Sequence, residues 1–272
     1  MNIKSVKILN NNTKMPLLGL GVFRSGERTY QAVRDALEVG YRHIDTAMIY
    51  ENEEAVGQAI KDSGIPREEI FVTTKLWNDD MRARRVQEAF EESLRKLDTD
   101  YVDLYLIHWP VKEEFVNSYK VMEKLYLKKQ IKAIGVSNFQ IHHLETLMKN
   151  TDIPPAVNQI ETHPYLTNIE VIKYCQSKGI ACEAWSPIAK GKVLTDPKLK
   201  ELADKYGKTE AQIALKWNLQ RGLIIIPKSV HRQRIIENSQ IFDFELSQQD
   251  MDLISSLNRD LRMGSHPDTF NF

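Results

Sequence analysis

Cysteine is scarce in this sequence, which has only Cys175 and Cys182 among its 272 residues. Two cysteines cannot supply the several disulfides on which small secreted domains depend. Cys175 lies in a helical pattern and Cys182 in the strand pattern that follows it. We therefore expect both to be ordinary interior thiols.

Long apolar runs are also missing. No segment approaches the roughly 20 apolar residues that a membrane-spanning helix needs. The N-terminal stretch MNIKSVKILNNNTK lacks the apolar core of a secretory signal. We therefore expect a cytoplasmic protein with no membrane partner.

An excess of charge of one sign is absent, because 37 Lys and Arg balance 37 Asp and Glu. This balance gives no overall field that would attract nucleic acid. The basic residues are spread over predicted helix faces rather than gathered in one arm. No long apolar surface strip stands out, so we expect a monomer.

Metal-binding motifs are missing as well. The seven histidines form no H-x-H or H-E-x-x-H pair. His142 and His143 are neighbours on a predicted helix, and we expect their side chains to point in different directions. The sequence therefore predicts no metal site.

The chain does contain an alternation of strand and helix patterns, over a length close to the ~250 residues of an eight-fold barrel. The strand candidates are residues 20–23, 41–47, 70–76, 102–108, 131–137, 156–161, 181–186 and 223–229. Between them, apolar residues recur three or four apart, which indicates helices. The predicted helices are residues 29–40, 53–64, 83–98, 115–128, 142–150, 169–179, 196–206, 209–222 and 232–242.

This alternation predicts an α/β fold with one domain, residues 1–272, built as a (β/α)8 TIM barrel. A hairpin of residues 6–20 is expected to plug the N-terminal mouth of the barrel. Residues 247–258 are predicted to form an extra helix, and the tail of residues 264–272 a mobile flap. The rival architecture, an open dinucleotide-binding sheet, requires G-x-G-x-x-G, and Arg24 stands where the third glycine would be.

Four chemically useful side chains lie at the downstream ends of three successive predicted strands. Asp45 and Tyr50 belong to the second strand and the loop after it, Lys75 to the third strand and His108 to the fourth. Because the carboxyl ends of barrel strands build the active site, we expect these groups to meet. Together they make a proton donor with a tuned pKa rather than a nucleophile triad.

Tyr50 is the expected general acid. A free tyrosine has a pKa of about 10 and is a poor acid at neutral pH. The Lys75 ammonium at about 4 Å would stabilise the phenolate and lower that pKa by as much as ~3. Tyr50 could then protonate the alkoxide formed when a carbonyl is reduced, while His108 donates a hydrogen bond to the oxygen or relays the proton.

Other interpretations of the same residues stay open from the residues alone. Asp45 and Lys75 would also suit a structural ion pair, Tyr50 a packed ring and His108 a satisfied core histidine. Lys75 could form a Schiff base, although Asp45 beside it would raise the lysine pKa and oppose that role. A Ser–His–Asp triad lacks G-x-S-x-G support.

None of these groups carries electrons, so carbonyl reduction requires a hydride-donating cofactor. Ser137, Asn138 and Gln159, at the ends of the fifth and sixth strands, offer polar groups suited to a carboxamide. Trp185 offers a flat face on which a ring can stack.

The eighth strand leads into a basic helix start. A helix N-terminus with Lys and Arg nearby suits a phosphate, and barrels often bind phosphate at this point. A solvated basic helix start is the simpler alternative. The polar residues concerned are Lys228, Ser229, Arg234, Glu237 and Asn238.

Seven segments resemble the aldo-keto reductase superfamily, in order and nearly from end to end. The likeness is closest to the bacterial branch of diketogluconate reductases and glyoxal or methylglyoxal reductases. It implies a TIM barrel, NADPH bound without a Rossmann domain, and reversible reduction of a carbonyl to an alcohol. The segments are residues 43–57, 72–77, 101–110, 131–139, 158–166, 183–192 and 225–247.

The resemblance also implies roles for individual residues. Asp45, Tyr50, Lys75 and His108 match the catalytic tetrad of the family, with Tyr50 as the acid. Phe23, Trp77, His108 and Trp109 match the substrate pocket. The residues matched to the cofactor site are Gly21, Val22, Phe23, Asp45, Ser137, Asn138, Gln159, Trp185, Ser186, Ile188, Lys228, Ser229, Val230, Arg234, Glu237 and Asn238.

The substrates implied are small carbonyl compounds such as glyoxal, methylglyoxal, aromatic aldehydes and keto sugars. Glu51 departs from the glycine that often follows the family's tyrosine, and Met48 from a commonly small residue. The short C-terminal loop predicts an open pocket that accepts several small aldehydes. A cofactor-binding sensor without turnover is the alternative function, and the complete tetrad argues against it.

Overall fold

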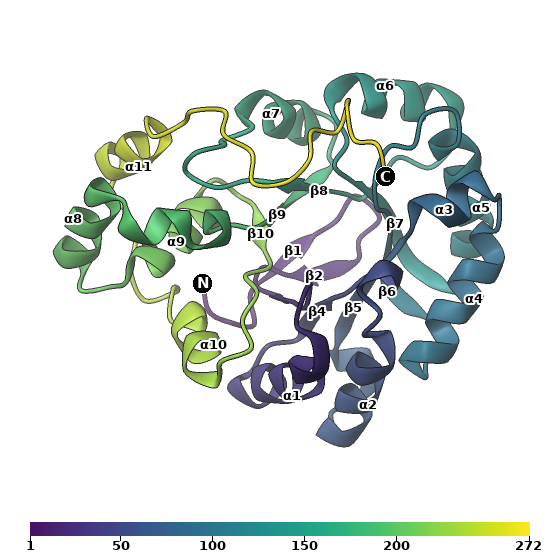
Figure 1. Cartoon of the computed structure of the whole chain (residues 1–272), viewed down its shortest axis with the longest axis horizontal. Coiled ribbons are helices and arrows are strands. Elements are labelled where there is room, and N and C mark those ends of the chain that lie inside the picture. The colour runs from purple at the N-terminus through teal and green to yellow at the C-terminus, as the bar shows by residue number, and fades with distance from the viewer.

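The computed structural model describes residues 1–272 and shows eight parallel strands surrounded by helices (Figure 1). The strands are hydrogen-bonded in chain order, β3 to β10. Leu18 pairs with Ile225 and Gly21 with Lys228, so the last strand meets the first and the barrel closes. The (β/α)8 prediction is therefore confirmed. The strands are β3 (Leu20–Gly21), β4 (His43–Asp45), β5 (Phe71–Leu76), β6 (Val102–Ile107), β7 (Ile131–Ser137), β8 (Val157–Glu161), β9 (Ala181–Trp185) and β10 (Ile224–Ile225).

The helices cover the outside of the barrel, as the apolar spacing predicts. Gly40 and Gly64 adopt left-handed φ values of 112° and 68° where the first two long helices end, which is why glycine stands there. The long connection before β10 contains two helices, as expected. The helices are α1 (Thr29–Val39), α2 (Glu53–Ser63), α3 (Asn78–Arg82), α4 (Val86–Leu97), α5 (Phe115–Leu127), α6 (Ile141–Asn150), α7 (Ile169–Ser177), α8 (Pro197–Tyr206), α9 (Glu210–Gln220), α10 (Arg232–Ser239) and α11 (Gln248–Ser255).

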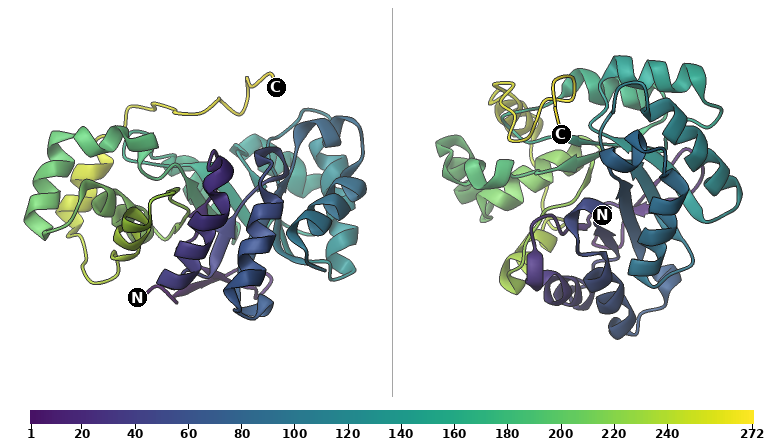
Figure 2. Two further views of the ribbon diagram at one scale, coloured as in Figure 1. Left: turned by 60° about the horizontal axis from the view of Figure 1, so that its bottom comes forward. Right: turned by 45° about the vertical axis from the view of Figure 1, so that its right-hand side comes forward.

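The N-terminal hairpin closes one mouth of the barrel. Its strands β1 (Val6–Ile8) and β2 (Lys14–Pro16) are antiparallel. Leu9 and Met15 are buried in one apolar cluster with barrel residues that include Leu104 and Val157. Figure 2 shows the hairpin at one end of the barrel and the C-terminal tail crossing the other. The plug prediction is confirmed.

Cys175 and Cys182 are buried free thiols, as predicted. No helix combines the length and the apolar character that a membrane crossing requires.

Candidate active site

The four predicted catalytic side chains come together at the carboxyl ends of the strands. Asp45 ends β4, Lys75 lies near the end of β5 and His108 directly follows β6. Tyr50 lies in a short 3-10 turn, Met48–Tyr50, after β4. The Lys75 ammonium is 5.1 Å from the centre of the Tyr50 ring, and the Tyr50 and His108 rings are 5.6 Å apart.

Lys75 and Asp45 form an ion pair inside the barrel. Lys75 Nζ donates to Asp45 Oδ1 at 2.7 Å and to the Thr46 carbonyl at 2.8 Å, and neither charged side chain is more than 3% exposed. Burial would lower the pKa of Lys75, but the negative charge of Asp45 and its hydrogen bond with the ammonium act in the opposite direction, and the pKa is raised. Burial also raises the pKa of Asp45, against the opposing effect of Lys75. Lys75 therefore stays an ammonium, which opposes Schiff-base chemistry.

The structure corrects the expected direction of the Tyr50 pKa. Burial raises this pKa above 10, although the charge and a hydrogen bond of Lys75 act to lower it. Desolvation of the phenolate thus outweighs the single ammonium. Tyr50 consequently remains protonated over the whole neutral range, with the Lys75 ammonium close to its ring.

His108 is held as a neutral imidazole. Burial, and secondarily the positive charge of Lys75, keep its pKa well below 6.5. Its ring lies edge-on to both Tyr50 and Trp77, at centroid distances of 5.6 and 5.2 Å. A neutral ring beside a phenol can donate one hydrogen bond to an oxygen in the cleft.

A second buried carboxyl, Glu183 on β9, lies beneath these residues. Gln159 Nε2 donates to Asp45 Oδ2 and to Glu183 Oε2, both at 2.7 Å. Burial, and then the nearby Asp45 charge, raise the pKa of Glu183 to about 8. Glu183 is not among the site residues predicted from the sequence, although an acidic residue inside an apolar strand is a visible signal.

The residues expected near a carboxamide are linked to one another. Ser137 Oγ donates to the Gln159 carbonyl at 2.9 Å, and Asn138 Nδ2 donates to the His108 carbonyl at 3.0 Å. Trp185 Nε1 donates to Asn138 Oδ1 at 2.9 Å. Hydrogen bonds thus hold Ser137, Asn138 and Gln159 in place beside the tetrad. Trp185 remains partly exposed.

Ser186 and Ile188 belong to a tightly turned loop after β9. Ser186, Ala189 and Lys190 have left-handed φ values of 48°, 50° and 52°, and Gly191 has 91°. The loop is closed by its own backbone, because the Ala189 N–H donates to the Ser186 carbonyl and the Gly191 N–H to the Ile188 carbonyl, both at 2.8 Å. Ser186 and Ile188 are both partly exposed.

The predicted phosphate residues surround the start of α10. Ser229 Oγ accepts a hydrogen bond from the His231 N–H at 3.1 Å and so orders the turn. Lys228 and Arg234 are exposed and form no ion pair, whereas Arg232 between them is paired with Asp35 and Glu38 at 3.0 and 2.7 Å. Two uncompensated cations at a helix N-terminus suit a phosphate.

The other predicted cofactor residues of this region lie on α10 or just before it. Glu237 accepts a hydrogen bond from Thr209 Oγ1 at 2.9 Å, which ties α10 to α9, and Asn238 is buried. Val230 is partly buried. Burial, and then the positive charge of Arg28, lower the pKa of Lys228, although Arg28 is not among the residues predicted from the sequence. No motif marked Arg28, because it comes from a distant turn.

Gly21, Val22 and Phe23 lie beside β10 and the tetrad. A side chain at Gly21 would lie 3.0 Å from the Ile226 carbonyl, so glycine allows the two strands to approach. The Val22 N–H donates to the Asp45 carbonyl at 3.1 Å. Phe23 is 47% exposed, and its ring centre is 4.9 Å from that of Tyr50. Phe23 is therefore open to solvent directly beside the predicted acid.

The tail corrects the expectation of an open pocket. Phe272 stacks on Trp77 with ring centres 5.8 Å apart, and it meets Trp109 edge-on at 5.2 Å. Phe270 lies 5.1 Å from Trp109. The structure thus lays the tail across the strand ends, against the predicted substrate residues, because aromatic rings there can bury surface on one another.

The tail is also tied to α6, which corrects the prediction for His142 and His143. Their rings are 4.0 Å apart and both face Asp268 Oδ1, at 3.3 and 3.6 Å. They do not diverge, because His143 Nδ1 accepts the Gln140 N–H in a capping box and is turned toward the helix start.

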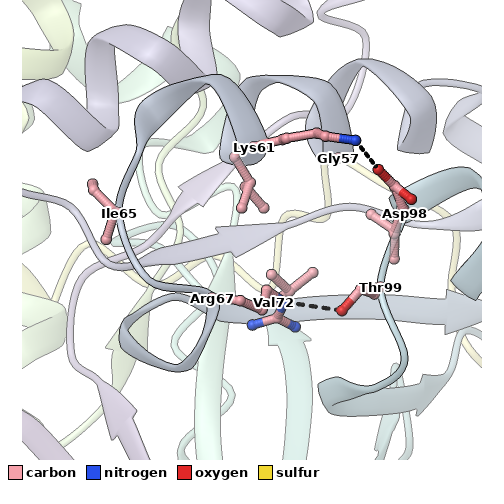
Figure 3. Close-up of a pocket in the computed structure, with 9 residues that line it drawn as sticks. Gly57, Lys61, Ile65, Arg67, Val72, Asp98 and Thr99 are labelled. Carbon is pink, nitrogen blue, oxygen red and sulfur yellow. Dashed lines mark hydrogen bonds and ion pairs between the residues drawn. The ribbon is translucent and has the colours of Figure 1, made fainter.

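A separate hollow lies on the outer layer (Figure 3). It has a volume of about 190 Å³ and lies between α2, α4 and the start of β5. The Lys61–Asp98 ion pair and a hydrogen bond from Arg67 to Thr99 border it. None of its lining residues belongs to the tetrad. They are Gly57, Ile60, Lys61, Ile65, Arg67, Val72, Leu97, Asp98 and Thr99.

Comparison with known proteins places this geometry in a family. The chain is 50% identical to a glyoxal reductase of Bacillus subtilis, over 100% of this chain and 99% of the relative. An aldo-keto reductase enzyme from a Medee basin deep-sea metagenome library superposes with a TM-score of 0.94 at 48% identity, covering 98% of this chain and 100% of that one. An aldo-keto reductase of Bombyx mori, solved in complex with NADP, gives a TM-score of 0.91 at 38% identity, covering 98% and 97%. Residues 18–259 match the Aldo/keto reductase family, and the chain therefore belongs to this family.

Proposed function

We propose that this protein is an NADPH-dependent reductase of small aldehydes and ketones, with Tyr50 as the general acid. Family membership supports carbonyl reduction, and the similar glyoxal reductase supports a small substrate. The observation that carries the proposal is the buried Lys75–Asp45 pair held against Tyr50 and His108 at one barrel mouth.

The residues of the site fit a nicotinamide dinucleotide. Gln159 Oε1 has no hydrogen-bond partner in the chain and keeps some exposed surface, so it can accept from a carboxamide. Lys228 and Arg234, free of ion pairs, would hold a 2′-phosphate. Ser137, Asn138 and Trp185 would border the nicotinamide, and the loop at Ser186 the pyrophosphate.

The tetrad would act in three ways. NADPH, when bound, supplies the hydride. Tyr50 holds its proton at neutral pH and releases it to the oxygen that becomes the alcohol, because Lys75 lies close enough to stabilise the phenolate. The neutral His108 ring orients that oxygen by a hydrogen bond. Asp45 keeps Lys75 charged and in place.

Replacement of Tyr50 tests the assigned acid. Tyr50→Phe should lower kcat for methylglyoxal reduction by about 10²–10⁴-fold, the contribution typical of a general acid. Binding of NADPH, followed by protein fluorescence, should stay within the wild-type range. Normal turnover by Tyr50→Phe would overturn the assignment.

The unpaired cations test the cofactor assignment. Lys228→Ala with Arg234→Ala should raise the Kd for NADPH by about tenfold or more per residue, as for hydrogen bonds to a charged group, and should change the Kd for NADH little. Arg232→Ala is the matched control, because that cation is already paired on the same helix. Equal losses for both cofactors would mean that the 2′-phosphate is held elsewhere.

We also propose that residues 1–272 act as one barrel domain, as a monomer in the cytoplasm. The large exposed apolar residues, such as Ile8, Leu127 and Leu261, lie in different parts of the chain, which supports a monomer. Sedimentation equilibrium at micromolar concentration should give the mass of one chain, and a dimer mass would contradict the proposal.

A further inference from the structure

Glu183 is a buried carboxyl that the tetrad mechanism does not use. It lies on β9 with no exposed surface, and Gln159 on β8 donates a hydrogen bond to its Oε2. Its other oxygen, Oε1, has no hydrogen-bond partner and lies 3.6 Å from His43 Nε2. A carboxyl in such a place must be either paired with a cation or uncharged.

The charges around Glu183 leave it without a cation of its own. The groups that face it are His43 and Asp45 on β4, Lys75 on β5 and the Gln159 amide on β8. Lys75 is already in direct contact with Asp45 at 2.7 Å. Burial lowers the pKa of His43 to about 3, so His43 is neutral as well. Only one ammonium is therefore present for two buried carboxyls. Because Lys75 contacts Asp45, Glu183 is the carboxyl that keeps a proton.

The position of Glu183 determines how the Gln159 amide is turned. The Gln159 NH2 group has two hydrogens, and it donates one to Asp45 and one to Glu183. Its Oε1 is thereby directed away from both carboxyls and keeps exposed surface. Without the acceptor on Glu183, only one of the two amide hydrogens would be held, and the amide could rotate.

We propose that Glu183 is a positioning residue for carbonyl reduction: it stays uncharged in the working enzyme and fixes the Gln159 amide with its oxygen toward the cleft. The proposal rests on the NADPH-dependent function proposed above, in which Gln159 meets the cofactor amide. The neutral state also keeps a second negative charge away from Lys75, so that the ammonium remains available to the Tyr50 phenolate. Loss of the Glu183 proton would raise the Tyr50 pKa further and weaken it as an acid.

Two replacements of Glu183 distinguish the effect of its hydrogen-bond acceptor from the effect of its charge. Glu183→Gln keeps the acceptor oxygen and the size and removes the charge, whereas Glu183→Leu keeps the approximate size and removes the acceptor. We expect Glu183→Leu to lower kcat and weaken NADPH binding by about tenfold, as for loss of a positioning hydrogen bond. Glu183→Gln should restore both values to within about threefold of the wild type, well inside the effect of one hydrogen bond. If Glu183→Gln is as damaging as Glu183→Leu, the carboxylate charge is needed and the proposal is wrong.

The pH profile is the readout that a purely structural role would not change. The kcat of the wild type should fall as pH rises through about 8, where Glu183 loses its proton. The Glu183→Gln profile should lack this component and fall only at higher pH. Superimposable profiles would contradict the proposal.

Thermal unfolding tests the proton on Glu183 without any turnover. In the wild type the folded state keeps this proton up to a pKa of about 8, while the unfolded chain loses it near 4.5. Stability of the wild type therefore falls with pH over this window, and the Tm advantage of Glu183→Gln should grow from pH 5 to 8 and then level off. Glu123→Gln on α5 is the control for removing a buried carboxyl that does not contact Gln159. A constant Tm difference would refute the uncharged state, whereas absence of NADPH turnover in the wild type would refute the proposed function alone.

Discussion

At the scale of single residues, the buried His43 side chain makes the free energy of unfolding depend on pH. It is fully buried, and its Nε2 lies 3.2 Å from Thr73 Oγ1. Burial, and then the charge of Lys75, lower its pKa to about 3. Because the unfolded chain takes up the proton near pH 6.5 and the folded chain does not, acid favours unfolding in the window between these values.

This linkage gives a prediction for acid stability. Through His43, the free energy of unfolding should fall by about 1.4 kcal/mol for each pH unit below 6.5, until the folded chain also takes up the proton. His43→Gln removes the titrating group, so its stability should fall less steeply between pH 6.5 and 4. Urea unfolding at several pH values measures both slopes, and equal slopes would show that His43 does not carry the effect.

Glu51 is a second residue with a measurable effect on stability. It has a left-handed φ of 54° directly after Tyr50, where a side chain is strained and glycine is not. Glu51→Gly should therefore raise the free energy of unfolding, by up to about 1 kcal/mol. Glu51→Ala is the control, because it keeps the Cβ and should give no such gain. A lower Tm for Glu51→Gly would contradict the prediction.

At the scale of elements, we expect the tail to form one side of the substrate site. Phe270 and Phe272 pack on Trp109 and Trp77, next to His108. Phe270→Ala with Phe272→Ala should open this side, so the ratio of kcat/KM for a bulky aromatic aldehyde to that for methylglyoxal should rise by about tenfold, as for a change of pocket size. Leu261→Ala, at an exposed position just before the tail, is the control. An unchanged ratio would mean that the rings do not limit substrate size.

The helices, the strands and the hairpin plug were well predicted from local patterns, whereas the packing of the C-terminal tail was not. The strand ends carrying Asp45, Lys75 and His108 follow from periodicity and from barrel geometry. The packing of residues 264–272 on Trp77 and Trp109 depends on rings distant in the chain, so no local pattern could indicate it. The direction of the Tyr50 pKa was wrong for the same reason, because burial depends on the whole surrounding shell.

At the scale of the whole molecule, the hairpin plug contributes to the stability of the barrel. Met15 is fully buried among interior residues of the barrel, whereas Val6 on the paired strand is 41% exposed. Met15→Ala should lower the free energy of unfolding by about 2–5 kcal/mol, because it leaves a cavity. Val6→Ala should have a much smaller effect. Urea unfolding provides the measurement, and equal effects would mean that the plug is not part of the cooperative core.

The hairpin and Phe272 lie at opposite mouths of the barrel, and this has a practical consequence for handling the protein. A purification tag or a bead attached at Met1 would lie at the hairpin end of the barrel, away from the predicted tetrad. The same attachment after Phe272 would begin beside Trp77 and crowd arriving aldehydes. Immobilised preparations should therefore be attached through the N-terminus if they are to remain fully active.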